Sequence, residues 1–107
     1  MWHTQVKRPV KLRGATGPES SLVNGVYVLT AERLNGKHVY AKEGDSNCWL
    51  FFATNSKWVI ADTVTKVENK LSSWAQTEAG LVHPAAAKEW EVNNGLENQR
   101  VVVTVMV

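Results

Sequence analysis

The feature that most constrains the fold is a series of short runs rich in β-branched and aromatic residues, separated by turn-forming residues. Such side chains pack well on a pleated sheet, and a spacing of about 8–12 residues between run starts is typical of antiparallel meanders, sandwiches and barrels. No segment keeps the apolar period of a helix over about ten residues. The predicted strands are Gln5–Leu12, Val26–Thr30, Lys37–Lys42, Cys48–Ala53, Lys57–Ala61, Ser72–Glu78, Glu89–Val92 and Arg100–Val107. We therefore predict an all-β fold: a single antiparallel meander, small barrel or sandwich of roughly six to eight strands, with at most one or two short helical turns.

The turns between these runs have a recognisable chemistry. Asn24-Gly25, Asn35-Gly36 and Asn94-Gly95 tolerate the positive φ angles that tight hairpins require. We expect the strands on either side of Asn35-Gly36 to form a hairpin with a longer or bulged loop, and the next two strands to continue it as a meander.

Two stretches do not fit a strand. Asp62–Lys70 is polar and has no clean period, so we expect a long loop there. Gly80–Lys88 contains Pro84 followed by three alanines. Because proline suits the first turn of a helix, this stretch predicts a single helical turn.

The composition predicts one compact domain. The chain has 107 residues, of which 44% are apolar, enough for one core but not for two. The loop-like stretch Gly14–Ser21 follows the start of the chain. We expect a basic N-terminal strand or arm with its loop over residues 1–21 and a single all-β domain over residues 22–107.

Basic residues are concentrated near the start of the chain, where Lys7, Arg8, Lys11 and Arg13 precede the first acidic residue. Such an arm can contact phosphate or an anionic membrane surface, or it can be a solvated edge strand whose charges discourage edge-to-edge aggregation. The solvated edge is our preferred interpretation. The net charge is only +2, whereas nucleic-acid-binding domains are usually far more basic, so a nucleic-acid partner is not expected.

The aromatic residues divide into two groups. Trp58 and Trp90 each share a strand face with an apolar residue, so we predict that both lie in the core. The run Cys48–Phe52 has two apolar faces, and Trp49 and Phe51 form one of them. Such a strand is either covered on both sides or exposes a sticky patch. Burial is the preferred interpretation, but Trp49 and Phe51 are the first candidates for contact with a partner.

Catalytic and metal-binding patterns are weak. His3, His38 and His83 lack the spacing of metal ligands. Cys48 could form a dyad with His38 only if both shared a face and a third group oriented the base, and we expect Cys48 to be a small core residue instead. We predict no catalytic residue, no metal and no cofactor, and we expect that the protein is not an enzyme.

The remaining sequence signals concern location. The chain has one cysteine, lacks Asn-x-Ser/Thr sequons and shows no signal-peptide core at its start, so we expect an intracellular, cytoplasmic protein. No apolar stretch approaches the ~18–20 residues of a membrane-spanning helix. The sequence does not predict an oligomeric state.

The C-terminal run Arg100–Val107 is rich in valine and has no charge beyond Arg100. Left unpaired, such a run is an aggregation hazard. We therefore expect an inner or closing strand, with Val101, Val103, Val105 and Val107 facing the core, paired with Glu89–Val92 and with an early strand.

The order of the motifs resembles a known pattern. It reads Asn24-Gly25-x-Tyr27, Asn35-Gly36-x-x-Val39-Tyr40-x-Lys42, Trp49-Leu50-x-Phe52, Trp58-x-Ile60 and Trp90-x-Val92-x-x-Gly95. This order resembles an uncharacterised small β-rich module of protist and algal proteins, including trypanosomatid hypothetical proteins, over about residues 24–95. The resemblance implies an all-β, non-enzymatic module of unassigned function, with Tyr27, Tyr40, Leu50, Trp58 and Trp90 as fold-defining positions. The stretch Asp62–Lys70 is thinner and poorer in glycine than in that module.

Two functional hypotheses follow. The first is a non-catalytic interaction module that binds an unknown protein or peptide through its sheet face or an exposed edge. The alternative is a small-molecule or nucleic-acid binder that uses exposed aromatic residues and the basic N-terminal arm. The first predicts an exposed apolar patch without a deep cavity, and the second predicts a concave pocket lined by tryptophan and a few convergent polar groups.

Overall fold

The computed structural model describes residues 8–92 and 97–106, so Lys7, the Asn94-Gly95 turn and Val107 lie outside the described residues. Its elements are β1 (Val10–Arg13), α1 (Ser20–Val23), β2 (Gly25–Leu34), β3 (Lys37–Lys42), β4 (Trp49–Phe52), β5 (Lys57–Ala61), α2 (Thr63–Val67), β6 (Ala75–Ala79), the 3-10 helix η1 (Pro84–Ala86), β7 (Trp90–Val92), β8 (Glu97–Gln99) and β9 (Val102–Val105).

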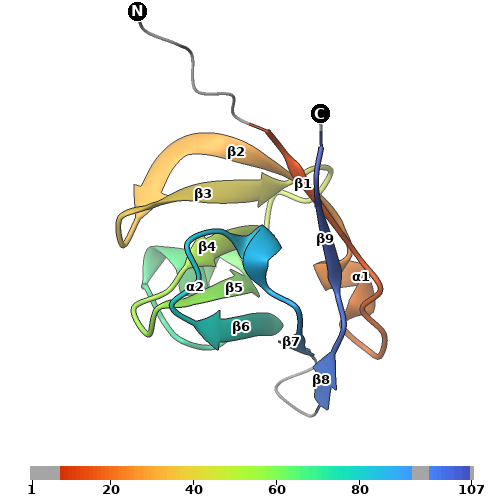
Figure 1. The fold of residues 1–107 in the computed structure, drawn as a ribbon. Helices are drawn as coiled ribbons and strands as arrows, with labels where there is room; N and C mark the ends of the chain where they lie inside the picture. Colours follow the sequence, from red (N-terminus) through yellow and green to blue (C-terminus); the bar gives the residue numbers. More distant parts are fainter. Residues whose placement is uncertain (1–7, 93–96, 107) are drawn as a thin grey trace, which may run out of the picture.

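The strands of the described residues form one antiparallel sheet in the order β8-β7-β6-β5-β4-β3-β2-β1-β9. The sheet curls into a half-barrel, and β8 and β9, which stand at opposite ends of the order, follow each other in the chain (Figure 1). The all-β prediction is confirmed. The ninth strand is β8, which we had left inside the connection after β7.

The beginning of the chain contributes to the sheet. β1 lies between β2 and β9 and pairs with both, and its Val10 and Leu12 are buried in the core while Lys11 and Arg13 are exposed. The stretch 1–21, which we expected to be a basic N-terminal strand or arm with its loop, therefore contains an inner strand of the sheet and not the solvated edge strand that we preferred.

The Asn35-Gly36 hairpin is confirmed, but its loop is tighter than expected. Leu34 pairs with Lys37, which leaves a two-residue loop, and Asn35 and Gly36 have φ angles of 53° and 84°, as this turn type requires. The irregularity lies further back, where the β2–β3 register shifts between Leu29 and Arg33.

Apolar side chains pack on both faces of the sheet. One cluster includes Trp58 and Trp90, whose burial confirms the prediction for both. The second cluster lies on the other face and consists of Val39, Phe51, Ala53, Val59 and Ala61. The five positions that the resemblance marks as fold-defining are all buried: Tyr27, Tyr40, Leu50, Trp58 and Trp90.

The prediction of a long loop over Asp62–Lys70 is wrong, because residues Thr63–Val67 form the helix α2. The Asp62 carboxylate accepts a hydrogen bond of 2.8 Å from the backbone N–H of Thr65, which caps the first turn. A helix of five residues is too short to show a period, and only its cap could have revealed it. The helical turn predicted at Pro84 is confirmed as η1. Across the described residues, every helix is too short to cross a membrane.

The C-terminal run Arg100–Val107 pairs only partly as expected. β8, just before it, pairs with β7, and β9 pairs with the early strand β1. Val101 is buried and Val103 packs against the core, as predicted. Val105 is 38% exposed, although its partner Val10 is buried, because β9 is the last strand of the sheet order and has a neighbour on one side only among the described residues.

Candidate functional site

The two aromatic residues that we singled out for binding do not form an exposed patch. Phe51 is fully buried in the cluster on the outer face, and Trp49 is partly buried against the same cluster. The physical reason is α2, which lies over this face of the sheet (Figure 1). The stretch that we expected to be a loop is a helix, and it covers this second apolar face, in line with the burial that we preferred over an exposed patch.

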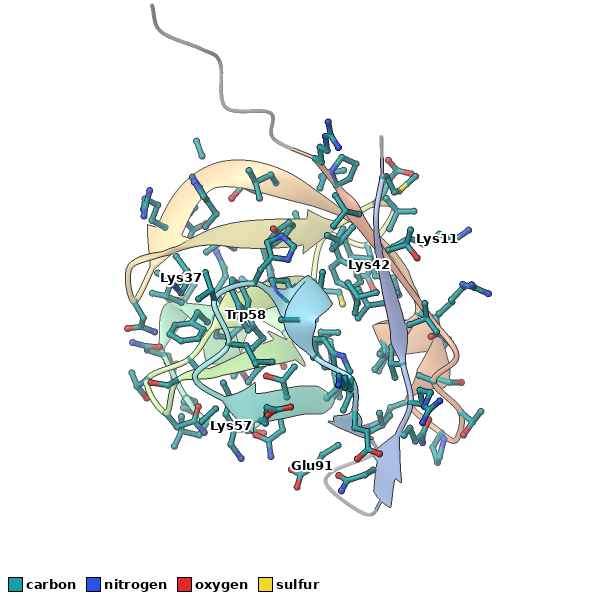
Figure 2. The ribbon with its side chains drawn as sticks, viewed as in Figure 1. Lys11, Lys37, Lys42, Lys57, Trp58 and Glu91 are labelled. Carbon is teal, nitrogen blue, oxygen red and sulfur yellow. The ribbon has the colours of Figure 1, made fainter. Side chains whose placement is uncertain are left out.

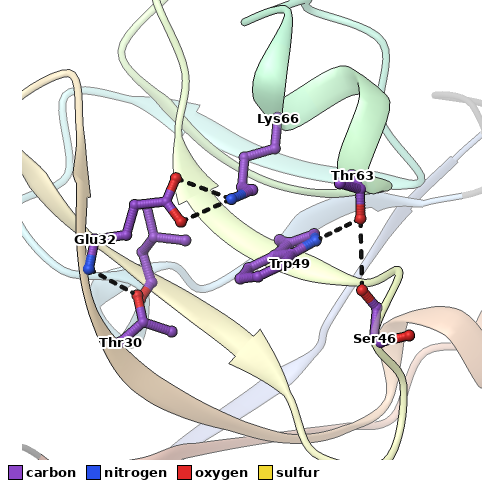
Figure 3. A network of polar contacts seen from close by, with 7 residues as sticks. Thr30, Glu32, Ser46, Trp49, Thr63 and Lys66 are labelled. Carbon is purple, nitrogen blue, oxygen red and sulfur yellow. Dashed lines mark hydrogen bonds and ion pairs between the residues drawn. The ribbon is translucent and has the colours of Figure 1, made fainter.

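A network of polar contacts holds α2 over Trp49 (Figure 3). The Lys66 ammonium lies 3.8 Å from the centre of the Trp49 ring and donates hydrogen bonds of 2.7 and 2.9 Å to the Glu32 carboxylate. The Trp49 indole N–H donates to the Thr63 hydroxyl at 2.9 Å. Thr30 accepts from the Glu32 backbone N–H within the irregular part of β2. This irregular part of β2 thereby directs the Glu32 side chain towards Lys66 of α2.

The basic candidates lie elsewhere on the molecule. Arg8, Lys11 and Arg13 are exposed, and Figure 2 shows Lys11 pointing away from the body of the protein. β2 and β3 separate β1 from β4 in the sheet. The structure therefore does not bring the described basic residues together with Trp49 and Phe51.

A groove that sequence analysis missed lies where the β7–β8 ladder ends. The register pairs Val92 with Glu97 and Trp90 with Gln99. If the ladder continued in this register, Glu89 would pair with Arg100, and residues 86–88 would pair with residues 101–103. These two segments instead separate and line a groove of about 570 Å³, with Ala85, Ala87, Lys88 and Glu89 on one wall and Arg100, Val101, Val102 and Val103 on the other. We call this space the split.

The β9 wall of the split presents a strand edge. The backbone N–H of Met106 donates to the Pro9 carbonyl, and in an antiparallel ladder the residues that bond to the neighbour alternate. Val102 and Thr104 therefore direct their backbone groups to β1, and Val101 and Val103 direct theirs to the split. β9 is the last strand in the order, so this edge has no strand partner among the described residues.

Charged side chains flank the split. Lys88, Glu89, Arg100 and Glu78 contribute to its lining, and the ion pairs found in the described part of the chain involve none of them. A smaller hollow of about 190 Å³ shares Glu78 and Glu89 with the split. Its other lining residues include Lys57 and Glu91, which lie near the end of the half-barrel formed by β6, β7 and β8 (Figure 2).

The opposite wall of the split is η1, which His83 fixes in place. The His83 Nδ1 accepts a hydrogen bond of 3.0 Å from the backbone N–H of Ala85, and its Nε2 lies 3.2 Å from the Tyr40 hydroxyl. Pro84 is buried beside it. Burial lowers the pKa of His83 and raises the pKa of Tyr40, so both groups are held in their neutral forms.

Cys48 has a structural environment. Its thiol is buried, donates to the Leu22 carbonyl at 3.3 Å and lies 3.7 Å from the Tyr27 hydroxyl. Burial is the main cause that raises the pKa of Cys48 and of Tyr27, so the thiol is kept protonated, the opposite of what a nucleophile needs. Within residues 8–92 and 97–106, no group of three or more His, Cys, Asp or Glu side chains could hold a metal ion.

Comparison of the chain with protein-family models, curated proteins and solved structures found no match. One sequence signal points to the split in retrospect. The predicted turn at Pro84 precedes a predicted strand that starts at Glu89, and a 3-10 helix in that position interrupts the pairing of any strand opposite it.

Proposed function

We propose that the protein is a non-catalytic peptide-recognition module, in which an extended segment of a partner protein adds as a strand to the free edge of β9 within the split. The observation that carries this proposal is the interrupted register: two segments that would continue the β7–β8 ladder face each other across a groove without pairing. Strand addition derives affinity from main-chain hydrogen bonds and specificity from pockets for alternate side chains.

The lining of the split defines the chemistry of the peptide. Towards the core it offers Ala87, Val101 and Val103, of which Ala87 and Val101 are buried, so the inward-facing side chains of the peptide should be small or β-branched and apolar. Towards the outside it adjoins the hollow that contains Glu78, Glu89 and Glu91 but only one lysine, Lys57. A lysine or arginine on the outer side of the peptide complements this charge.

The proposal can be tested by selecting peptides from a random display library and measuring their affinity for two variants. Val103→Pro removes the backbone N–H that faces the split while leaving the bonds to β1, and proline is tolerated on an edge strand. Val103→Ala shortens the same side chain but keeps the N–H, so it is the matched control. We expect the proline variant to bind about tenfold or more weakly, because one hydrogen bond contributes roughly 0.5–1.5 kcal/mol and the ring also blocks the edge.

Methylation of alternate backbone nitrogens of the selected peptide tests the same ladder from the other side. Methyl groups on the nitrogens that face β9 should abolish binding, and those on the intervening nitrogens should not. Equal binding to Val103→Pro and wild type, or insensitivity to methylation, would contradict strand addition. A small organic ligand that binds the split while no peptide does would favour the alternative of a small-molecule binder.

A further inference from the structure

The split is narrower than an inserted strand requires. Cα atoms of η1 and β9 approach each other to within 8 Å, whereas a strand placed between two neighbours needs about 4.8 Å on each side, or about 9.6 Å in all. A peptide that adds to β9 beside η1 therefore needs this wall to move outwards. What fixes η1 thus controls access to the split, and this inference rests on the proposed function.

His83 holds η1 through both of its ring nitrogens. Because Nδ1 accepts the Ala85 N–H, the ring proton of the neutral form is on Nε2, which then donates to the Tyr40 hydroxyl. Tyr40 belongs to β3, so the imidazole connects the beginning of η1 to the body of the sheet. The His83 and Tyr40 rings are in edge-to-face contact at 6.4 Å, and Tyr40 makes a similar contact with Trp58.

The groups that contact His83 would not stabilise a positive charge on its imidazole. The titratable group that faces it from β3 is the Tyr40 hydroxyl, which is neutral, and the group that faces it from η1 is a backbone N–H. The ion pairs of the described residues do not include His83. A second proton would bind to Nδ1. This nitrogen could then no longer accept the hydrogen bond from the Ala85 N–H, so the cap of η1 would be lost.

We propose that His83 is a pH-sensitive latch of the split: the neutral imidazole keeps η1 close to β9, and the imidazolium releases η1 and lets a peptide reach the edge. Histidine is suited to this role because its ordinary pKa of about 6.5 lies close to neutrality, and burial of His83 lowers this pKa, so release takes place on the acid side of the ordinary value. Since a ligand and a proton that favour the same state assist each other's binding, the peptide binds more tightly in mild acid. Reciprocally, the bound peptide raises the pKa of His83.

The first experiment uses the free protein and needs no peptide. NMR follows the imidazole of His83 and the hydrogen exchange of the Ala85 amide from about pH 8 down to the pH at which the imidazole signals show His83 to be protonated. We expect the Ala85 amide to lose about tenfold in protection, corrected for intrinsic exchange, as His83 becomes protonated. The buried amides of β4 and β5 should keep their protection, which separates local release from unfolding.

Two variants complete the test. In His83→Asn, the side chain can still cap η1 but cannot titrate, so the Ala85 amide should remain protected at both ends of the pH range. Tyr40→Phe removes the second anchor, so it should weaken protection already at neutral pH. Unchanged Ala85 protection between neutral and protonated His83 in the wild type would overturn the latch.

The second experiment measures the affinity of a selected peptide at both pH values. Wild type should bind several-fold more tightly in acid, and His83→Asn should show no change. Equal affinity in wild type at both pH values would overturn the latch even if the split binds peptides. A latch that is present in the free protein, together with no peptide binding at either pH, would instead contradict the proposed function alone.

Discussion

Two short helical segments in this protein have opposite effects on the sheet. α2 follows β5, lies across the outer face and closes it, because Asp62 caps its first turn and Lys66 bridges Trp49 and Glu32. η1 lies between β6 and β7 in the chain, where the partner of a longer β7–β8 ladder would be, so the ladder stops at Trp90 and the edge of β9 has no strand partner among the described residues. A helical insertion therefore covers a sheet when it crosses the strands and opens the sheet when it replaces part of one.

The face under α2 and the split should differ most in the free energy of unfolding that is lost when a side chain is truncated. Phe51→Ala, under α2, should destabilise the protein by about 3–5 kcal/mol, because it leaves a cavity in a closed cluster. Val102→Ala, on the wall of the split, should cost about 0.5 kcal/mol or less, since Val102 is 40% exposed. Urea denaturation followed by tryptophan fluorescence measures both. Similar costs would show that the outer face is not closed.

The next largest effect tests what fastens α2. Lys66→Met keeps the volume of the side chain but removes the ammonium from the Trp49 ring and from Glu32, and we expect a loss of about 1–2 kcal/mol. Glu32→Gln should cost less, because the Glu32 side chain is 47% exposed. In a double-mutant cycle the two changes should be coupled by about 0.5–1 kcal/mol. Strictly additive costs would mean that the ion pair does not hold the helix.

A smaller effect is expected from the cap of α2. Asp62→Ala should cost about 1 kcal/mol at neutral pH, and Asp62→Asn, which can still cap, should cost less. Hydrogen bonds from Thr65 lower the pKa of Asp62, so its charged form stabilises the fold above the ordinary value of about 3.9, and this contribution is lost as the pH falls through the lowered pKa. Urea titrations at several pH values should show the wild type approaching the alanine variant in acid. A constant gap between them would contradict this assignment.

The smallest effect on stability is expected in the split itself. Glu89 is exposed, so Glu89→Gln should change the free energy of unfolding by no more than about 0.5 kcal/mol. The same variant should weaken binding of peptides that carry a basic residue and leave binding of neutral peptides unchanged. Calorimetric titration with a matched pair of peptides measures this difference. If binding of both peptides were weakened equally, Glu89 would not distinguish basic from neutral peptides.

The sequence predicted the elements whose signals are local. The Asn35-Gly36 hairpin, the turn at Pro84 and the burial of Trp58 and Trp90 all follow from residue types at fixed offsets. α2 was missed because five residues are too few for an apolar period, although Asp62 is a cap residue. Lys66 was missed because its partners, Glu32 and Trp49, are remote in the sequence, and only the folded sheet brings the three together.

The candidate site was harder to predict than the fold. Trp49 and Phe51 were chosen because alternation places them on a second apolar face, but alternation does not show what covers that face. The split arises from a mismatch in length between two predicted strands, one starting at Glu89 and the other extending past Arg100. Which edge remains unpaired depends on where β9 finds its neighbour, and that neighbour is β1, at the other end of the chain.

The pairing of β1 with β9 has a consequence for the order of folding. The ladders from β2 to β6 join segments that are close in sequence, whereas the β1–β9 ladder joins Val10 with Val105. Because contacts between remote segments form slowly, we expect the central meander to form early in refolding and the half-barrel to close last. Until it closes, β1 exposes an edge of its own, so the interval before closure is when two molecules can exchange their C-terminal strands.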